Sequence, residues 1–132
     1  MNNNIESNDE VYKEQIIAHY EHPHNKGVLE KPSVSCHEFN PYCGDEITIY
    51  LKIEGRIVKD AKFEGRGCAI STSSASMLTD YIKGKSVDEV KQINFKEMVD
   101  LLGIDPGPAR LKCMMLPLKA THKAIENIQS RK

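Results

Sequence analysis

Neither sign of charge dominates this sequence, and no apolar run approaches the length that spans a membrane. The 18 basic and 19 acidic side chains give a formal net charge of −1. Without a basic excess, nucleic-acid binding has no electrostatic support. The apolar stretches fall well short of the roughly 20 residues that a transmembrane helix requires. Nucleic acids and membranes are therefore not expected as partners.

Signals for export and for repeated architecture are also missing. The first nine residues are rich in Asn and acidic side chains, without the basic and apolar regions of a signal peptide. We expect residues 1–9 to be disordered and residues 10–132 to form a single domain, because no internal repeat or long linker interrupts them. The expected location is the cytoplasm, where the four cysteines favour metal binding or redox chemistry over disulfides.

A regular alternation of apolar residues predicts a small α+β domain. Residues 46–54 carry isoleucine or leucine at every second position, which is typical of a half-buried strand. Glu54-Gly55 predicts a tight turn, residues 56–64 its hairpin partner, and residues 33–39 a first strand. We therefore expect a three-stranded antiparallel sheet covered on one face by helices.

Helical signals occur on both sides of this predicted sheet. A helix is expected over residues 10–21, with one apolar face formed by Val11, Ile16, Ile17 and Tyr20. After the sheet, a helix follows Cys68, and capping signals at Ser86 and Asn94 start two short helices. A long helix then runs to about residue 130. Because proline breaks a helix interior but suits a first turn, Pro117 predicts that the regular helix begins only three or four residues before it, next to Cys113.

Three cysteines lie in backbone settings that suit a thiolate. Cys43 lies in Asn-Pro-Tyr-Cys-Gly-Asp, Cys68 in Gly-Arg-Gly-Cys and Cys113 in Arg-Leu-Lys-Cys. The last two precede or begin predicted helices, whose N-termini stabilise negative charge. Lys112 adds a cation beside Cys113, and Asp45 places a carboxylate two residues after Cys43. Glycines 44, 65 and 67 leave room for the backbone to approach an ion or a partner's loop.

Three thiolates and one carboxylate can complete a tetrahedral zinc site. The same set can hold an iron–sulfur cluster, whose permanent sites normally use four cysteines. Replacing a soft sulfur by a hard oxygen should weaken the hold on a cluster. Such a labile site suits a protein that donates its cluster rather than one that stores it.

The residues alone leave alternatives open. The intervals of 25 and 45 residues between the cysteines match no zinc-finger or zinc-ribbon pattern, so three unrelated structural cysteines remain an interpretation of equal weight. A structural zinc domain is a further alternative, and nucleophilic hydrolysis lacks a base near any cysteine. Cys36 is expected to be a small buried hydrophobic residue outside the site. His37 is the reserve candidate for a metal ligand. The polar run of residues 71–74 is attributed to close helix packing rather than to phosphate binding.

At these motifs the sequence resembles the IscU/SufU/NifU N-terminal family of iron–sulfur cluster assembly proteins. The resemblance covers about residues 11–128, and its opening segment is His19-Tyr20 followed by Pro23-His24-Asn25. Asn-Pro-Tyr-Cys-Gly-Asp, Gly-Cys-Ala-Ile-Ser and Lys-Cys then follow in the family's order. The resemblance implies a SufE/NifU-like fold with an N-terminal helix and a long C-terminal helix.

The resemblance also implies a role for each motif. Cys43, Cys68 and Cys113 would ligate a transient [2Fe-2S] cluster, or Zn²⁺ in the cluster-free form, with Asp45 as a further ligand that keeps the cluster transferable. A cysteine desulfurase would deliver persulfide sulfur to Cys43 or Cys113, with Lys112 assisting. The assembled cluster would pass to apo iron–sulfur proteins. The expected protein is a non-enzymatic scaffold, either a monomer or a weak homo-oligomer.

Markers of the two branches of this family are mixed. Lys112 replaces the histidine that precedes the third cysteine in IscU-type scaffolds, as in SufU-like members. The extra segment that SufU-type zinc sulfurtransferases carry between the second and third cysteines is nevertheless missing. Residues 105–110 also replace the Leu-Pro-Pro-Val-Lys chaperone motif of IscU, which argues against dependence on a dedicated Hsp70 chaperone pair. A zinc-dependent sulfurtransferase that accepts persulfide sulfur is therefore the alternative function.

Overall fold

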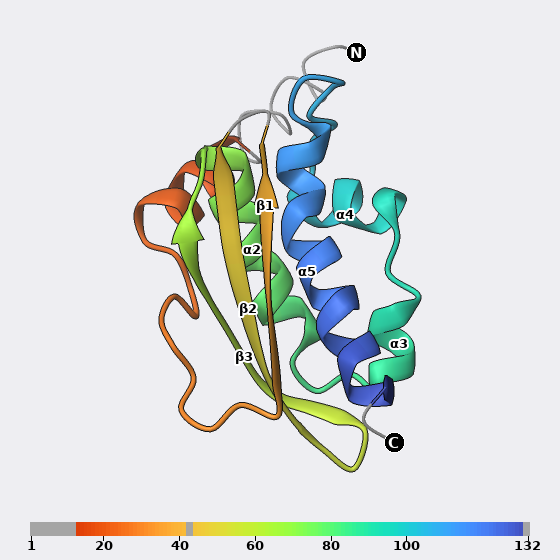
Figure 1. The fold of residues 1–132 in the computed structure, drawn as a ribbon. Helices are drawn as coiled ribbons and strands as arrows, with labels where there is room; N and C mark the ends of the chain where they lie inside the picture. Colours follow the sequence, from red (N-terminus) through yellow and green to blue (C-terminus); the bar gives the residue numbers. More distant parts are fainter. Residues whose placement is uncertain (1–12, 42–43, 131–132) are drawn as a thin grey trace.

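The computed structural model describes residues 13–41 and 44–130, and the expected disordered segment 1–9 lies outside these residues. Three strands form one antiparallel sheet in the order β1-β2-β3 (Figure 1). Their bounds are β1 Val34–Asn40, β2 Asp45–Glu54 and β3 Ile57–Arg66. The helices after the sheet are α2 Ala69–Ile82, α3 Val87–Lys91, α4 Phe95–Leu102 and α5 Leu111–Ser130. The predicted α+β class is confirmed.

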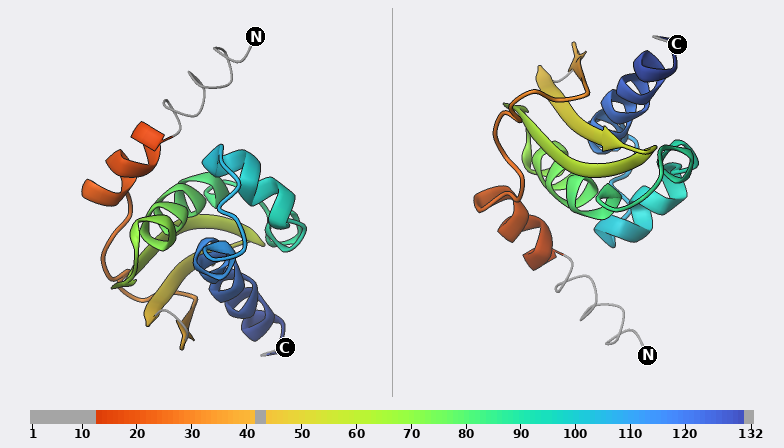
Figure 2. Two further views of the ribbon diagram at one scale, coloured as in Figure 1. Left: turned by 90° about the horizontal axis from the view of Figure 1, so that it is seen from above. Right: turned by 90° about the horizontal axis from the view of Figure 1, so that it is seen from below.

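The helices cover one face of the sheet and leave the other face open (Figure 2). α5 packs on β1 and β2, α2 packs on β3 and on α5, and the short helices α3 and α4 complete the helical layer. The inward side chains of the strands meet these helices in one apolar core, which includes fully buried Ile49, Leu51, Leu78 and Ile125. Burial in β2 alternates as predicted, because successive side chains of a strand point to opposite faces.

Both predicted helix caps are present. The Ser86 hydroxyl accepts a hydrogen bond from the amide of Glu89, whose carboxylate accepts one from the Ser86 amide in return. The Asn94 side chain accepts a hydrogen bond from the amide of Glu97, and α4 ends at Gly103 with a left-handed backbone. No helix in the described part of the chain combines the length and apolar character needed to cross a membrane.

The prediction for the start of α5 is wrong. The helix begins at Leu111, so Pro117 lies in its interior and Cys113 lies in its first turn. Pro117 has no N–H to donate to the carbonyl of Cys113, which is the usual i to i−4 bond. The surrounding turns are held by burial of Met114, and the carbonyl of this residue accepts a hydrogen bond at 2.7 Å from the Ser74 hydroxyl. Packing against α2 thus offsets the lost bond.

The predicted apolar face of the N-terminal helix is also partly wrong. Residues 13–21 are helical and Ile16 is buried, but Ile17 and Tyr20 are 52% and 47% exposed; Val11 lies outside the described residues. Ile16 joins the apolar core, and a narrow stripe of polar contacts also joins this helix to α2. In this stripe the Ser73 hydroxyl donates to the Ile16 carbonyl at 2.6 Å, and the His19 Nδ1 lies 2.6 Å from the Ser76 Oγ.

Gly65 is required where β3 approaches β2 most closely. A Cβ atom on this residue would lie 2.2 Å from the backbone oxygen of Glu46, and the residue has φ +142°. We expect Gly65→Ala to lower the free energy of unfolding by about 3 kcal/mol, because it combines backbone strain with overpacking. The measurement is chemical denaturation followed by circular dichroism.

Gly84→Ala is the matched control. Gly84 also has a positive φ, of +88°, but a Cβ there would meet no atom within 4 Å. Backbone strain alone should cost about 1 kcal/mol. Equal losses in the two variants would contradict the assigned clash with Glu46.

Candidate metal and sulfur site

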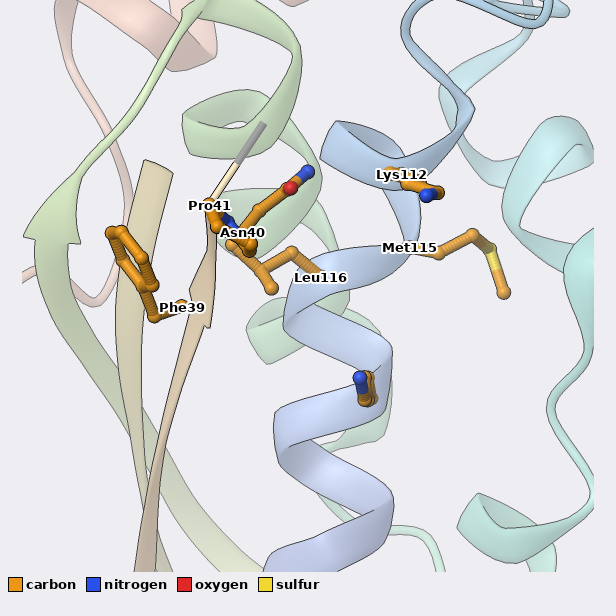
Figure 3. Close-up of a pocket in the computed structure, with 7 residues that line it drawn as sticks. Phe39, Asn40, Pro41, Lys112, Met115 and Leu116 are labelled. Atoms are coloured by element: carbon orange, nitrogen blue, oxygen red, sulfur yellow. The ribbon is translucent and has the colours of Figure 1, made fainter. Parts of the chain in front are cut away.

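Three segments that are distant in the sequence converge at one end of the sheet. Asn40 pairs with Asp45 at the last position of the β1–β2 ladder, and Glu46 pairs with Arg66 at the last position of the β2–β3 ladder. The chain therefore enters β2 and leaves β3 at neighbouring positions. Cys68 is the second residue after the end of β3, and α5 begins near the same end of the sheet (Figures 1 and 3).

This convergence brings together Asp45, Cys68 and Cys113. One potential ligand atom from each residue, a carboxylate oxygen or a sulfur, lies within 4.8 Å of the others. Asp45 and Cys113 are buried, at 5% and 3% exposure, whereas Cys68 is half-buried. The remaining predicted ligand, Cys43, lies outside the described residues. Two sulfurs and one oxygen at this separation form a donor set of the type that binds zinc or iron.

The Asp45 carboxylate is the most unusual group in the cluster. Its Oδ2 atom is fully buried and has no hydrogen-bond partner among the residues that the structure describes. A buried oxygen of this kind costs free energy unless it is paired. Because the sulfurs of Cys68 and Cys113 lie within 4.8 Å, a cation bound between these groups would supply the pairing that no described residue provides.

Cys68 occupies the N-cap position of α2 without using its side chain as a cap. Its backbone is extended, with φ −73° and ψ 175°, and its carbonyl accepts the Thr72 amide at 3.0 Å. Its sulfur lies 3.8 Å from the hydroxyl oxygen of Ser71, which also donates to the Cys68 carbonyl at 3.2 Å. Sequence reasoning placed Ser71 among packing residues. The interval of one helical turn between Cys68 and Ser71 was the signal that could have indicated this contact.

The glycines beside Cys68 make room for the chain itself, not for an ion or a partner. A Cβ on Gly67 would lie 2.0 Å from the Ser71 Oγ and 3.5 Å from the Asp45 Cγ. The corresponding atom on Gly65 would clash with the backbone of β2. A Cβ on Gly44 would meet no atom within 4 Å. The positive φ of this residue, +75°, therefore accounts for the glycine better than a close approach of other atoms does.

Lys112 is exposed and lines a pocket of about 250 Å³ beside the cluster. The pocket lies between the end of β1 and the first turns of α5 (Figure 3). Its lining combines apolar groups with two lysines: Phe39, Asn40, Pro41, Lys112, Met115, Leu116 and Lys119. The Phe39 side chain is 54% exposed. The surface beside Asp45, Cys68 and Cys113 is therefore both apolar and basic.

Cys36 and His37 lie apart from the cluster. Burial and the nearby Glu38 carboxylate raise the pKa of the Cys36 thiol, although Lys123 acts in the opposite direction. A raised pKa disfavours the thiolate that metal ligation needs. His37 points to the opposite face of the sheet from Asn40, and its Nε2 lies 3.1 Å from a Glu46 oxygen. The reserve ligand considered from the sequence is thus outside the cluster.

Similarity to known proteins follows the same motifs. The NifU-like N-terminal domain family matches residues 11–132, which is nearly the whole chain. This chain belongs to the NifU-like N-terminal family. The zinc-dependent sulfurtransferase SufU of Bacillus subtilis is 40% identical over 89% of this chain and 90% of that protein. The iron–sulfur cluster assembly scaffold protein IscU of Thermotoga maritima is 37% identical over 89% of this chain and 94% of that protein.

The fold is also that of the family. The crystal structure of the N-terminal part of a nitrogen-fixing NifU-like protein from Brucella abortus superposes with a TM-score of 0.78. It is 22% identical and covers 94% of this chain and 98% of that one. At this identity the match shows the fold alone. The resemblance seen in the sequence motifs is therefore confirmed at the level of family and fold.

Removing the negative charge of Asp45 should stabilise the metal-free protein. We expect Asp45→Asn to raise the free energy of unfolding by about 1 kcal/mol, because a neutral amide is less costly to bury without a partner than a carboxylate. The measurement is urea denaturation in reducing buffer with a chelator. Asp100→Asn is the control, since Asp100 is exposed on α4 and its substitution should have little effect. A lower stability for Asp45→Asn would contradict the view that this carboxylate is held at a cost.

Proposed function

We propose that this protein is a scaffold for iron–sulfur cluster assembly. It receives iron, persulfide sulfur and, from an external electron donor, the electrons that reduce this sulfur to sulfide. It holds the resulting labile [2Fe-2S] cluster through Cys43, Cys68, Cys113 and Asp45, and transfers the cluster to apoproteins. A cysteine desulfurase supplies the sulfur, with Cys43 or Cys113 as the acceptor. The observation that carries this proposal is the buried Asp45 oxygen, which lies beside two cysteine side chains and which no residue in the described part of the chain pairs.

The combination of sulfur and oxygen ligands favours a cluster that is released over one that is bound permanently. Sulfur ligands suit iron in a cluster, whereas a carboxylate is a harder ligand that binds soft centres less tightly. Helix N-termini at Cys68 and Cys113 stabilise the negative charge that a ligating sulfur carries. Zn²⁺ fits the same residues in the cluster-free form and would keep the sulfurs together there. The partly exposed side of Cys68 gives a route for exchange.

The rate of cluster loss tests the role of Asp45. We expect Asp45→Ala to lengthen the lifetime of an anaerobically reconstituted cluster roughly several-fold, because it removes the hard ligand that favours release. The measurement is the decay of visible absorption in excess EDTA, which captures the iron that the protein releases. Asp100→Ala serves as the control, because Asp100 is a carboxylate that lies outside the group formed by Asp45, Cys68 and Cys113. An unchanged lifetime in Asp45→Ala would remove Asp45 from the transfer step.

A zinc-dependent sulfurtransferase is the second candidate function. It is favoured by Lys112 before the third cysteine and by the 40% identity to the SufU of Bacillus subtilis. In this interpretation Zn²⁺ holds the thiolates until a desulfurase displaces one of them, which then accepts persulfide sulfur. The short connection from α2 to α5, made by α3 and α4, speaks for the scaffold instead.

Metal and acid-labile sulfide in protein purified without oxygen separate the two functions. The scaffold predicts iron and sulfide in equal amounts after reconstitution, with visible charge-transfer bands. Tightly bound zinc, resistance to reconstitution and faster desulfurase turnover would instead support the sulfurtransferase. In that case Lys112→Gln should reduce the stimulation of the desulfurase several-fold, because it removes the cation beside Cys113. Lys123→Gln is the control, because this lysine pairs with Glu38 at 3.1 Å, away from the cluster.

A further inference from the structure

The Ser71 hydroxyl has an environment that differs from those of its neighbours on α2. Ser73 donates to the Ile16 carbonyl of the N-terminal helix, and Ser74 donates to the Met114 carbonyl of α5. These two hydroxyls join helices. Ser71 is just as buried, at 3% exposure, but its hydrogen-bond partners are the carbonyl and the sulfur of Cys68. Ser71 therefore contacts a residue of the proposed metal site, whereas Ser73 and Ser74 join helices.

The backbone around Ser71 is shaped to admit this contact. Gly67 has no Cβ, and the position where one would lie is 2.0 Å from the Ser71 Oγ. The same position is 3.5 Å from the Asp45 Cγ, so Ser71 and Asp45 flank the same gap beside Cys68. Any other residue at position 67 would displace the hydroxyl. The glycine at position 67 is thus explained by Ser71, and the buried Asp45 oxygen that no described residue pairs belongs to the neighbouring side chain.

A hydroxyl in this position can serve both forms of Cys68. It has one proton to donate and two lone pairs to accept with. In the structure it donates to the Cys68 carbonyl and can accept from the thiol. A metal-bound sulfur has no proton, but rotation about the Ser71 Cβ–Oγ bond lets the hydroxyl donate to it. The carbonyl stays paired meanwhile, because the Thr72 amide also donates to it at 3.0 Å.

We infer that Ser71 is a positioning residue for the metal site: its hydroxyl donates a hydrogen bond to the ligating sulfur of Cys68 and directs that sulfur toward Asp45 and Cys113. This inference rests on the proposed function, because it assumes that Cys68 is a ligand. Partners of this kind orient ligands and tune the bound metal, and their loss typically lowers metal affinity 10- to 100-fold.

The test compares Ser71→Ala with Ser73→Ala, using Zn²⁺ and Co²⁺ as probes. Both variants remove one buried hydroxyl from α2, but only Ser71 contacts Cys68. We expect Ser71→Ala to lower Zn²⁺ affinity about tenfold in competition with a chromophoric chelator. It should also shift the sulfur-to-cobalt charge-transfer band to longer wavelength, because a sulfur without its hydrogen bond is a stronger electron donor. Ser73→Ala should leave both quantities at the wild-type values.

Ser71→Gly provides a second variant without the hydroxyl. It changes helix propensity in the opposite direction from alanine, so the same spectral shift in both variants assigns the effect to the hydroxyl. A Ser71→Ala protein that matches Ser73→Ala in affinity and in spectrum would overturn the inference, while the proposed function would stand. Failure of the wild-type protein to bind either metal would overturn the proposed function and the inference together.

Discussion

The carboxylate of Asp45 is held out of water at the end of the sheet, with one oxygen that no described residue pairs. This position follows from backbone pairing. Asp45 is the first residue of β2 and lies opposite Asn40, so its side chain points to the helical face together with Ile47 and Ile49. A carboxylate on that face is enclosed by the same helices that bury the core. The strand register therefore imposes a cost that a bound cation would offset.

The helices that carry the cysteines are tied to each other close to the site. The Ser74 hydroxyl of α2 donates to the carbonyl of Met114, which directly follows Cys113 on α5. Ser74 lies less than two turns beyond Cys68 along α2. A shift of one helix along the other would break this buried hydrogen bond, and an unpaired buried group costs about 1–3 kcal/mol. The separation of the two sulfurs is thus maintained by this hydrogen bond from the Ser74 side chain to the main chain of α5.

The proposed labile site combines a rigid interior with an accessible edge. Asp45 and Cys113 are buried, Cys68 is half-buried, and the pocket with Phe39 and Lys112 opens beside them. An apolar and basic border suits contact with another protein, since exposed aromatic groups are common where partners bind. Two kinds of relative align with most of this chain: proteins named as scaffolds and one named as a sulfurtransferase. Both proposed functions require sulfur to reach the site from outside, and the half-buried Cys68 lies on the accessible edge.

Local patterns in the sequence were enough to predict the three strands and the capped helices. Alternation in β2 and the caps at Ser86 and Asn94 depend only on neighbouring residues, so they can be predicted without the fold. The start of α5 could not, because the packing that keeps Pro117 inside a helix comes from α2. The exposure of Ile17 could not be predicted either, because it depends on which face of the N-terminal helix packs against the domain: Ile16 joins the core and Ile17 does not.

The sequence by itself determined which residues are available for the chemistry: three cysteines and an aspartate in ordered motifs, with cations and glycines beside them. Only the tertiary structure decided that Asp45, Cys68 and Cys113 meet, that no described residue pairs with one Asp45 oxygen, and that Ser71 contacts Cys68. The physical reason is that local patterns depend on the spacing of residues along the chain. The distance between two side chains depends instead on strand register and helix packing, which join positions far apart in the sequence.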